Sequence, residues 1–298
     1  MVFFEKKMSC IYWYSHYVLD VLTKELILTV GEKSIVEMIA EYMDGPQLIQ
    51  TIQVPSNGYS KIYNNLIYHL LYQFEFAVYD LEGHLINRFG SHGYDDGQFQ
   101  RVSYFQVYRN KLYVADAGQH RIQILDTNNN RTVGSIGQYG NGLGDFDEPT
   151  YFDFCDHKII VISHHGTKIQ VFDIDTFDFL YQCGVQEFNT YNSVAVIQNV
   201  ICVFETTIST IHKFDSTDGK LLTIIYCGTP LDEYHCCTLH NYNYQCMLVN
   251  FNKKTIRIRN QSYKYEMIYQ IPRFISHITI HKERIYGFSS ENYISVFQ

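Results

Sequence analysis

Short apolar runs separated by polar segments recur from residue 46 to the end of the chain, a pattern typical of β-strands. Runs such as Leu66–Leu71 and Lys158–Ser163 alternate only weakly between apolar and polar positions, which indicates strands buried on both faces. Every third run is closed by an acidic or amide residue, and these closing residues lie roughly 38 to 47 positions apart: Asp80, Asp126, Asp173, Asp215, Asn260 and Gln298. This period fits a four-stranded propeller blade, so the sequence predicts an all-β, six-bladed β-propeller.

The last of the six repeats lacks a fourth strand of its own. In the first five repeats a further apolar run follows the closing residue, at 85–89, 132–136, 179–183, 221–226 and 265–270. The segment 48–54 precedes the first complete repeat and has the same character. We therefore expect this N-terminal strand to pair with residues 293–297 and to close the last blade, because an open ring would expose two strand edges.

The clearest copy of the repeat covers residues 90–126. Gly90, Gly93 and Gly97 lie in a polar loop that ends at Phe99, and glycine suits loops that need a positive φ or a close backbone approach. Two expected strands follow at 104–108 and 112–115, then a tight polar corner at 116–121 and a third strand at 122–126. A second glycine-rich loop at 137–149 repeats the opening of this motif.

The corner and its flanking strands resemble the NHL repeat, whose core reads tyrosine-valine-alanine-aspartate followed by arginine-isoleucine-glutamine. The matching residues here are Tyr113, Val114, Ala115, Asp116, His120, Arg121, Ile122 and Gln123. The resemblance extends over residues 46–298, is strongest at 90–173, and implies a six-bladed propeller. NHL propellers of ubiquitin-ligase proteins bind RNA or protein, but the chain has no zinc-binding RING or B-box pattern, so ligase activity is not implied.

Residues 1–45 do not fit the repeat, and we interpret them as a separate N-terminal extension preceding a propeller domain at 46–298. Within them, residues 32–43 place apolar side chains at helical spacing, and Asp44, Gly45 and Pro46 then end the predicted helix. The segment 17–30 fits a helix or a pair of strands. The extension is expected to be a cap packed on the domain or a docking arm.

The composition favours one class of binding partner and one cellular compartment over others. The net charge of −8 disfavours a surface built for a phosphate backbone, so RNA ranks below protein as a partner. Eight cysteines without a repeated CxxC spacing predict reduced, buried thiols and a cytoplasmic protein. The sequence shows neither a secretory signal nor an apolar run long enough to cross a bilayer, and it leaves the oligomeric state open.

The metal and phosphate motifs are weak, and no cofactor is expected. His277 and His281 have the spacing of two zinc ligands on a helix, but their segment predicts a strand, on which they would lie about 13 Å apart. The cluster from His235 to Cys246 also lies on expected strands, where neighbours face opposite ways. The glycines at 137–144 are not followed by the lysine and helix of a phosphate-binding loop.

The loops that join one blade to the next, together with those joining second to third strands, share one face of a propeller, here called the loop face. We expect it to bind a protein partner, because tyrosine and arginine are frequent interface hot spots. The candidate residues are Tyr94, Arg101, His120, Arg121, Tyr139, His164, His165, Phe188 and Tyr191.

Asp116 and Arg121 are expected to be structural, bonding the backbone of the turn between them. Their equivalents in the other repeats are Ser163, Glu205, Asn250 and Phe288 for the aspartate, and Lys168, Thr210, Thr255 and Tyr293 for the arginine. The leading hypothesis is therefore a non-catalytic interaction scaffold. A metal-dependent lactonase-like hydrolase, using Asp116, Glu205 and Asn250, is the alternative from another class. An RNA-binding NHL domain is the third hypothesis.

Overall fold

The computed structural model describes twelve segments of the backbone, and the figures show the rest as a grey trace. The described backbone comprises residues 48–53, 59–163, 167–184, 191–205, 210–226, 237–242, 245–250, 255–259, 266–270, 275–281, 284–289 and 293–297. Side chains are described for 59–163, 167–184, 191–205 and 210–226. The helix expected at 32–43 lies outside these residues.

The described strands form antiparallel four-stranded sheets. The first two sheets contain β2 (Ser60–Tyr63), β3 (Leu66–Leu71), β4 (Glu75–Tyr79) and β5 (Leu85–Phe89), then β8 (Val102–Tyr108), β9 (Lys111–Asp116), β10 (Arg121–Asp126) and β11 (Thr132–Ile136). The third contains β12 (Tyr151–Cys155), β13 (Lys158–Ser163), β14 (Lys168–Asp173) and β15 (Phe179–Cys183). The fourth contains β16 (Tyr191–Ile197), β17 (Val200–Glu205), β18 (Thr210–Asp215) and β19 (Leu221–Tyr226).

Two further sheets are described by their backbone. One contains β20 (Cys237–Tyr242), β21 (Gln245–Asn250), β22 (Thr255–Arg259) and β23 (Glu266–Gln270). The other joins β24 (Ile275–His281), β25 (Arg284–Ser289) and β26 (Tyr293–Phe297) to β1 (Leu48–Gln53) in the order β1-β26-β25-β24. A short parallel pair, β6 (Ser91–His92) and β7 (Gln98–Phe99), and a 3₁₀ turn, η2 (Ala117–Gln119), complete the described elements.

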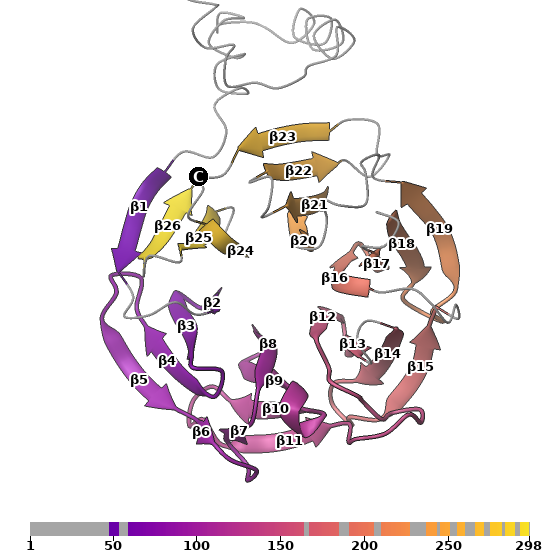
Figure 1. The fold of residues 1–298 in the computed structure, drawn as a ribbon, viewed down its shortest axis with the longest axis horizontal. Coiled ribbons are helices and arrows are strands. Elements are labelled where there is room, and N and C mark those ends of the chain that lie inside the picture. Colours follow the sequence, from indigo (N-terminus) through magenta and orange to yellow (C-terminus); the bar gives the residue numbers. More distant parts are fainter. Residues whose placement is uncertain are drawn as a thin grey trace, which may run out of the picture.

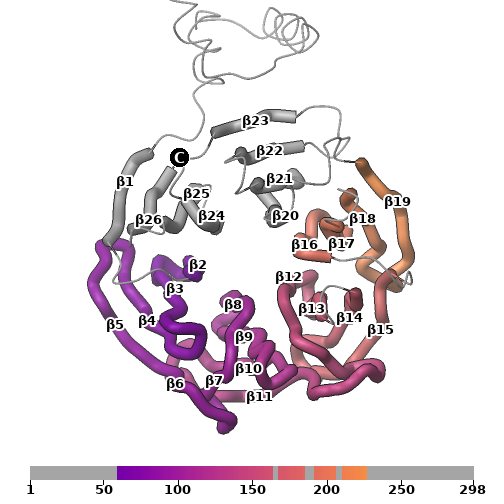
Figure 2. Tube along the Cα trace, viewed as in Figure 1, coloured from indigo at the N-terminus to yellow at the C-terminus, as the bar shows by residue number. Residues whose placement is uncertain are grey.

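The sheets lie around a common centre (Figure 1). The innermost strands are β2, β8, β12, β16, β20 and β24, and the outermost strands are β5, β11, β15, β19, β23 and β1. The inner strands of neighbouring sheets contact one another in the pairs β24 and β2, β2 and β8, β8 and β12, β12 and β16, and β16 and β20. The part with described side chains forms an arc from β2 to β19 (Figure 2). No helix in the described residues is long and apolar enough to cross a membrane.

Burial follows the position of a strand within its sheet. Five of the six residues of β9, β13 and β17 are buried, because these second strands lie between two neighbouring sheets. The outer strands β5 and β19 are almost entirely exposed. Aromatic rings fill the space between sheets: Phe76 meets Phe105 edge-on at 5.0 Å between centroids, and Tyr108 stacks on Phe154 at 4.3 Å.

The residues that close the third strands have a local role. Asp126, Asp173 and Asp215 accept backbone N–H groups two residues further on at 2.7 to 2.8 Å, which fixes the turn into the fourth strand. The Asp173 carboxylate accepts the N–H groups of both Thr176 and Asp175, and these two hydrogen bonds lower the pKa of the carboxyl. In these three repeats the periodic acid therefore forms the turn into the fourth strand.

Strand β1 pairs with β26 in antiparallel register, with Thr51 opposite Ser295 and Gln53 opposite Tyr293. The two strands come from opposite ends of the described chain. Because β26 pairs with β25 on its other side, β1 supplies the fourth strand of this sheet. In the last sheet the residue equivalent to Asp116 is Ser289, and the equivalence to Phe288 expected from the sequence is wrong. Ser289 lies opposite the first residue of β24, as Asp116 lies opposite Val102, the first residue of β8.

Deletion of residues 1–57 is expected to destabilise the protein and promote aggregation, because it removes β1 and leaves β26 as an unpaired edge. Deletion of residues 1–44 keeps β1 and serves as the matched control. Thermal unfolding and sedimentation of the two purified proteins measure the difference. Equal melting temperatures and equal solubility would contradict a closing role for β1.

Candidate partner-binding site

The loop of residues 90–99, here called the first loop, is fastened to its own sheet by side chains from β9 and β10. The carboxylate of Asp116 is fully buried and accepts the backbone N–H groups of Gln100 and Arg101 at 3.0 to 3.2 Å. Gln123, also fully buried, donates from Nε2 to the Gln98 carbonyl at 2.6 Å and accepts the Gly97 N–H at 3.1 Å. The loop backbone is thus satisfied by strand side chains.

Arg121 fastens the tip of the first loop. Its Nη2 donates to the carbonyls of Tyr94 and Asp95 at 3.2 and 3.5 Å, and its Nη1 lies 3.8 Å from the Asp96 carboxylate. Gln119 adds a 2.8 Å bond from Nε2 to the Gly93 carbonyl. The expectation that Asp116 and Arg121 bond the turn between them is wrong: both are structural, but they hold the preceding loop.

The loop of residues 137–146, the second loop, is held in the same way 47 positions later. Gln170 Nε2 donates to the Asp145 carbonyl at 2.8 Å, and Gln170 Oε1 accepts the Gly144 N–H at 2.7 Å. Lys168 Nζ donates to the carbonyls of Asn141 and Gly142 at 2.5 and 3.2 Å. A basic residue at the start of a third strand and a glutamine two positions later therefore form a recurrent clamp.

A glycine and a phenylalanine complete each loop. Phe99 and Phe146 are fully buried, and Phe146 packs edge-on against Phe172 at 5.3 Å. Gly137 has a φ of +82°, and a Cβ there would lie 2.2 Å from the Phe146 ring. The loop therefore requires glycine at this position both for its backbone conformation and for the space the ring occupies.

Large side chains remain exposed on these fixed loops. Tyr94 is 73% exposed, Tyr139 is 72% exposed and Leu143 is 69% exposed. Tyr72, which no sequence motif marks, is 70% exposed in the β3–β4 turn. The neighbouring Gln73 carbonyl accepts the Val102 N–H at 2.9 Å, which places this turn beside the strand that follows the first loop.

Charged groups between the loops are mostly paired. Arg101 forms an ion pair with Glu148 at 2.6 Å, linking the second sheet to the loop that enters the third. His120 has a left-handed φ of +55°, accepts the Glu148 N–H at Nδ1, and contacts the Tyr139 ring edge-on at 4.7 Å. The predicted residues Tyr94, Arg101, His120, Arg121 and Tyr139 thus belong to the same two loops and their supports.

Of the four remaining predicted residues, the structure describes Tyr191 alone. Tyr191 is buried, 4% exposed, and contacts the His212 ring edge-on at 5.4 Å, so its expected exposure is wrong. It begins the inner strand β16 and not an exposed connector. His164, His165 and Phe188 lie outside the described residues.

Two of the three residues suggested for a lactonase-like metal site, Asp116 and Glu205, have internal partners, and the side chain of Asn250 lies outside the described residues. Glu205 lies 2.7 Å from His212 Nε2 and accepts the Thr210 hydroxyl at 3.3 Å, while Asp116 is occupied by backbone N–H groups. Burial lowers the pKa of His212, and the Glu205 carboxylate partly opposes this shift. Within the residues with described side chains, no three His, Cys, Asp or Glu groups lie close enough to hold a metal ion.

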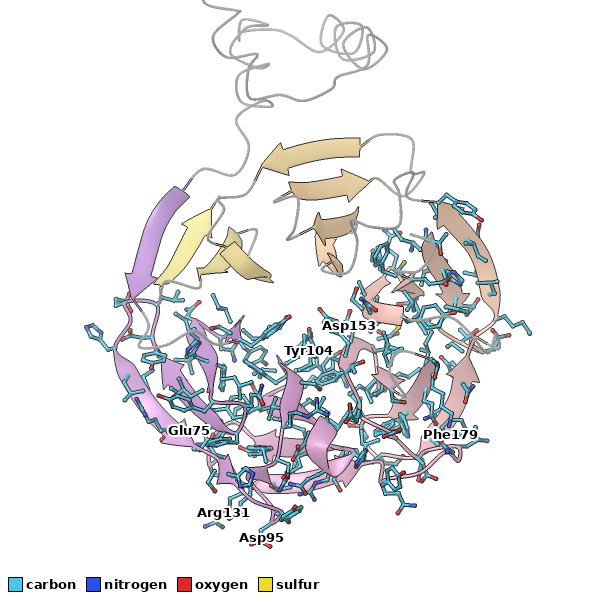
Figure 3. The ribbon with its side chains drawn as sticks, in the orientation of Figure 1. Glu75, Asp95, Tyr104, Arg131, Asp153 and Phe179 are labelled. Carbon is cyan, nitrogen blue, oxygen red and sulfur yellow. The ribbon has the colours of Figure 1, made fainter. Side chains whose placement is uncertain are left out.

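A second polar cluster lies on the inner strands and was not found from the sequence. It contains Lys61 on β2, Tyr104 and Gln106 on β8, and Tyr151 and Asp153 on β12. Figure 3 shows Tyr104 and Asp153 at the inner side of the arc, facing its centre. The residues lie at positions typical of ordinary strands, so no motif marks them, and only the arrangement of the sheets brings them together.

Comparison with known proteins places the fold in the β-propeller class. A virginiamycin B lyase from Staphylococcus aureus superposes with a TM-score of 0.60 at 10% identity, covering 85% of this chain and 100% of the other. A chain of the Mitotic Checkpoint Complex gives 0.57 at 13% identity, covering 80% and 73%. BamB from Moraxella catarrhalis gives 0.51 at 14% identity, covering 80% and 71%. No family model and no curated protein matches the sequence.

Asp116→Ala is expected to lower the free energy of unfolding by about 1 to 3 kcal/mol, because it removes the buried carboxylate that accepts the Gln100 and Arg101 N–H groups. Asp96→Ala is the control, since that carboxylate is 74% exposed and 3.8 Å from its partner; it should change stability by less than about 0.5 kcal/mol. Urea unfolding followed by circular dichroism measures both. Equal effects would show that Asp116 does not support the loop.

Proposed function

We propose that the chain is a non-catalytic scaffold that binds a protein partner through the loop face. The observation that carries this proposal is the exposure of large side chains on loops whose backbones are already fixed. Tyr72, Tyr94 and Tyr139 are each at least 70% exposed. The strand clamps hold the loops of Tyr94 and Tyr139, and the hydrogen bond from the Val102 N–H to the Gln73 carbonyl holds the turn of Tyr72. Large side chains on loops that a rigid scaffold holds in place are suited to act as anchors for a partner.

The fixed loops lower the cost of association. Ordering a flexible loop on binding costs conformational entropy, about 0.5 to 1.5 kcal/mol for each immobilised side chain and more for backbone. Here Gln123, Arg121, Gln170 and Lys168 hold the loop backbones before any partner arrives. Tyrosine adds a large contact area with few rotatable bonds, so it suits an anchor on such a surface.

The other two functions have less support. RNA binding requires a positive face, yet the first and second loops and their junction carry Asp95, Asp96, Asp145, Asp147 and Glu148, and Arg101 and Arg121 are already engaged with carboxylates or loop carbonyls. A lactonase would need Asp116 and Glu205 free for a metal, and both have internal partners. Two superposing structures are lyases, but one of the others belongs to a multi-protein assembly.

The proposal includes an architecture and a location. We infer six blades, closed by the pairing of β1 with β26, in a domain of residues 46–298 with an NHL-like repeat, preceded by an extension of residues 1–45. The support is the repeated clamp, the period of the turn-forming acids and the six four-stranded sheets among the described strands. A cytoplasmic location is proposed from the thiols, of which Cys155, Cys183 and Cys202 are described, are buried and form no disulfide.

Tyr139→Ala is expected to weaken capture of the partner at least tenfold while leaving the melting temperature almost unchanged, because the ring is largely exposed and packs edge-on against the His120 ring. The partner is first identified by affinity purification with the full chain, and its affinity for each variant is then measured by titration calorimetry.

Ile86→Ala is the matched control for this experiment. Ile86 is 56% exposed on the outer strand β5, away from the loops, so its removal should leave affinity unchanged. Equal affinity for the wild type and for the Tyr72, Tyr94 and Tyr139 variants would refute the loop face as the binding surface.

A further inference from the structure

Lys61 is a buried lysine on the inner strand β2, 7% exposed, and lies where three sheets meet. Its Nζ lies 4.8 Å from the centre of the Tyr104 ring and 5.9 Å from that of Tyr59. Tyr104 in turn stacks on Tyr151 at 3.9 Å between ring centres. The amine thus faces aromatic rings supplied by β8 and the residue before β2, and a ring from β12 stacks behind the first of these.

The Lys61 amine makes no hydrogen bond or ion pair with the described residues. The nearby carboxylate of Asp153 is used otherwise: Oδ2 accepts the Val196 N–H at 2.8 Å and Oδ1 accepts Gln106 Nε2 at 3.4 Å. Gln106 also accepts the Tyr104 hydroxyl at 3.0 Å. Asp153 therefore acts on Lys61 through charge alone, and the amine is left as the group in the cluster without a polar partner.

This environment favours the neutral amine. Burial lowers the pKa of Lys61 to about 8, and the Asp153 carboxylate opposes the shift. At neutral pH roughly a tenth of the side chain is then the free base, compared with less than about a thousandth for an ordinary lysine. A desolvated amine of this kind is the nucleophile that condenses with carbonyl compounds.

We propose that Lys61 forms a carbonyl-binding site on the inner strands, where its amine condenses with a small aldehyde or ketone to give an imine. The nitrogen lone pair attacks the carbonyl carbon and yields a carbinolamine, which loses its hydroxyl and a nitrogen proton as one molecule of water. No oxidant or reductant is required. The rings of Tyr59 and Tyr104 select a small, apolar or flat carbonyl compound, and the site is separate from the loop face.

The test is reductive trapping in the full-length protein. Acetaldehyde with sodium cyanoborohydride converts an imine into a stable ethylated lysine, which peptide mass spectrometry assigns to a position. Ethylation of Lys61 is expected to be half-maximal near pH 8 and, at pH 7.5, at least about tenfold faster than that of Lys220. Lys220 is the internal control, since it is exposed and Asp218 raises its pKa.

Two variants separate this site from general lysine reactivity. Lys61→Arg keeps the positive charge and should abolish trapping at this position while Lys220 reacts as before. Asp153→Asn removes the opposing charge and should move the midpoint of Lys61 ethylation to lower pH, provided that circular dichroism shows the fold intact.

The proposal is overturned if Lys61 in the wild-type protein stays unmodified from pH 6 to 10, or if it reacts with the same pH dependence as Lys220. It is also overturned if glyoxylate protects Lys61 without forming a trappable imine, because that result would make the amine an anion-binding group. None of these readouts depends on the partner of the loop face.

Discussion

The glutamine clamp on the third strand is the interaction on which the arrangement of the loops depends. Each described copy, at Gln123 and Gln170, uses one amide to accept a loop N–H and donate to a loop carbonyl, while the basic residue two positions earlier holds the loop tip. The amide is buried, so these bonds form away from competing water, and their loss would leave several backbone groups unsatisfied. The clamp converts a glycine-rich segment, which is costly to order, into a rigid part of the blade.

Divergence of the clamp in the fourth sheet shows which part of the repeat is replaceable. His212 occupies the glutamine position there, and it pairs with Glu205, which occupies the position of Asp116. Two residues that elsewhere bond loop backbone thus bond each other. The same two positions in successive sheets therefore give either a loop support or an acid–base pair, in which the Glu205 carboxylate contacts His212 and Thr210.

The loop face and the inner cluster have different chemistry because they have different access to water. Tyr94 and Tyr139 lie on solvent-exposed loops, where charge is screened and contact area provides most of the affinity. Lys61 and Asp153 lie on inner strands, where burial shifts the pKa values of both groups toward their neutral forms. We therefore propose one scaffold that carries a macromolecular surface on its loops and a reactive amine on its inner strands.

The sequence alone determined the all-β class, the four-stranded period, the glycine-rich loops and the exposed Tyr94 and Tyr139, because strand periodicity and turn chemistry are local properties. Tertiary structure decided that Tyr191 is buried and that Tyr72 is exposed, since burial depends on which sheet covers a strand end. It also decided that Asp116 holds the preceding loop and not its own turn. The cluster around Lys61 could not be predicted, because residues 61, 104 and 153 carry no common motif and meet only when three separate sheets pack around one centre.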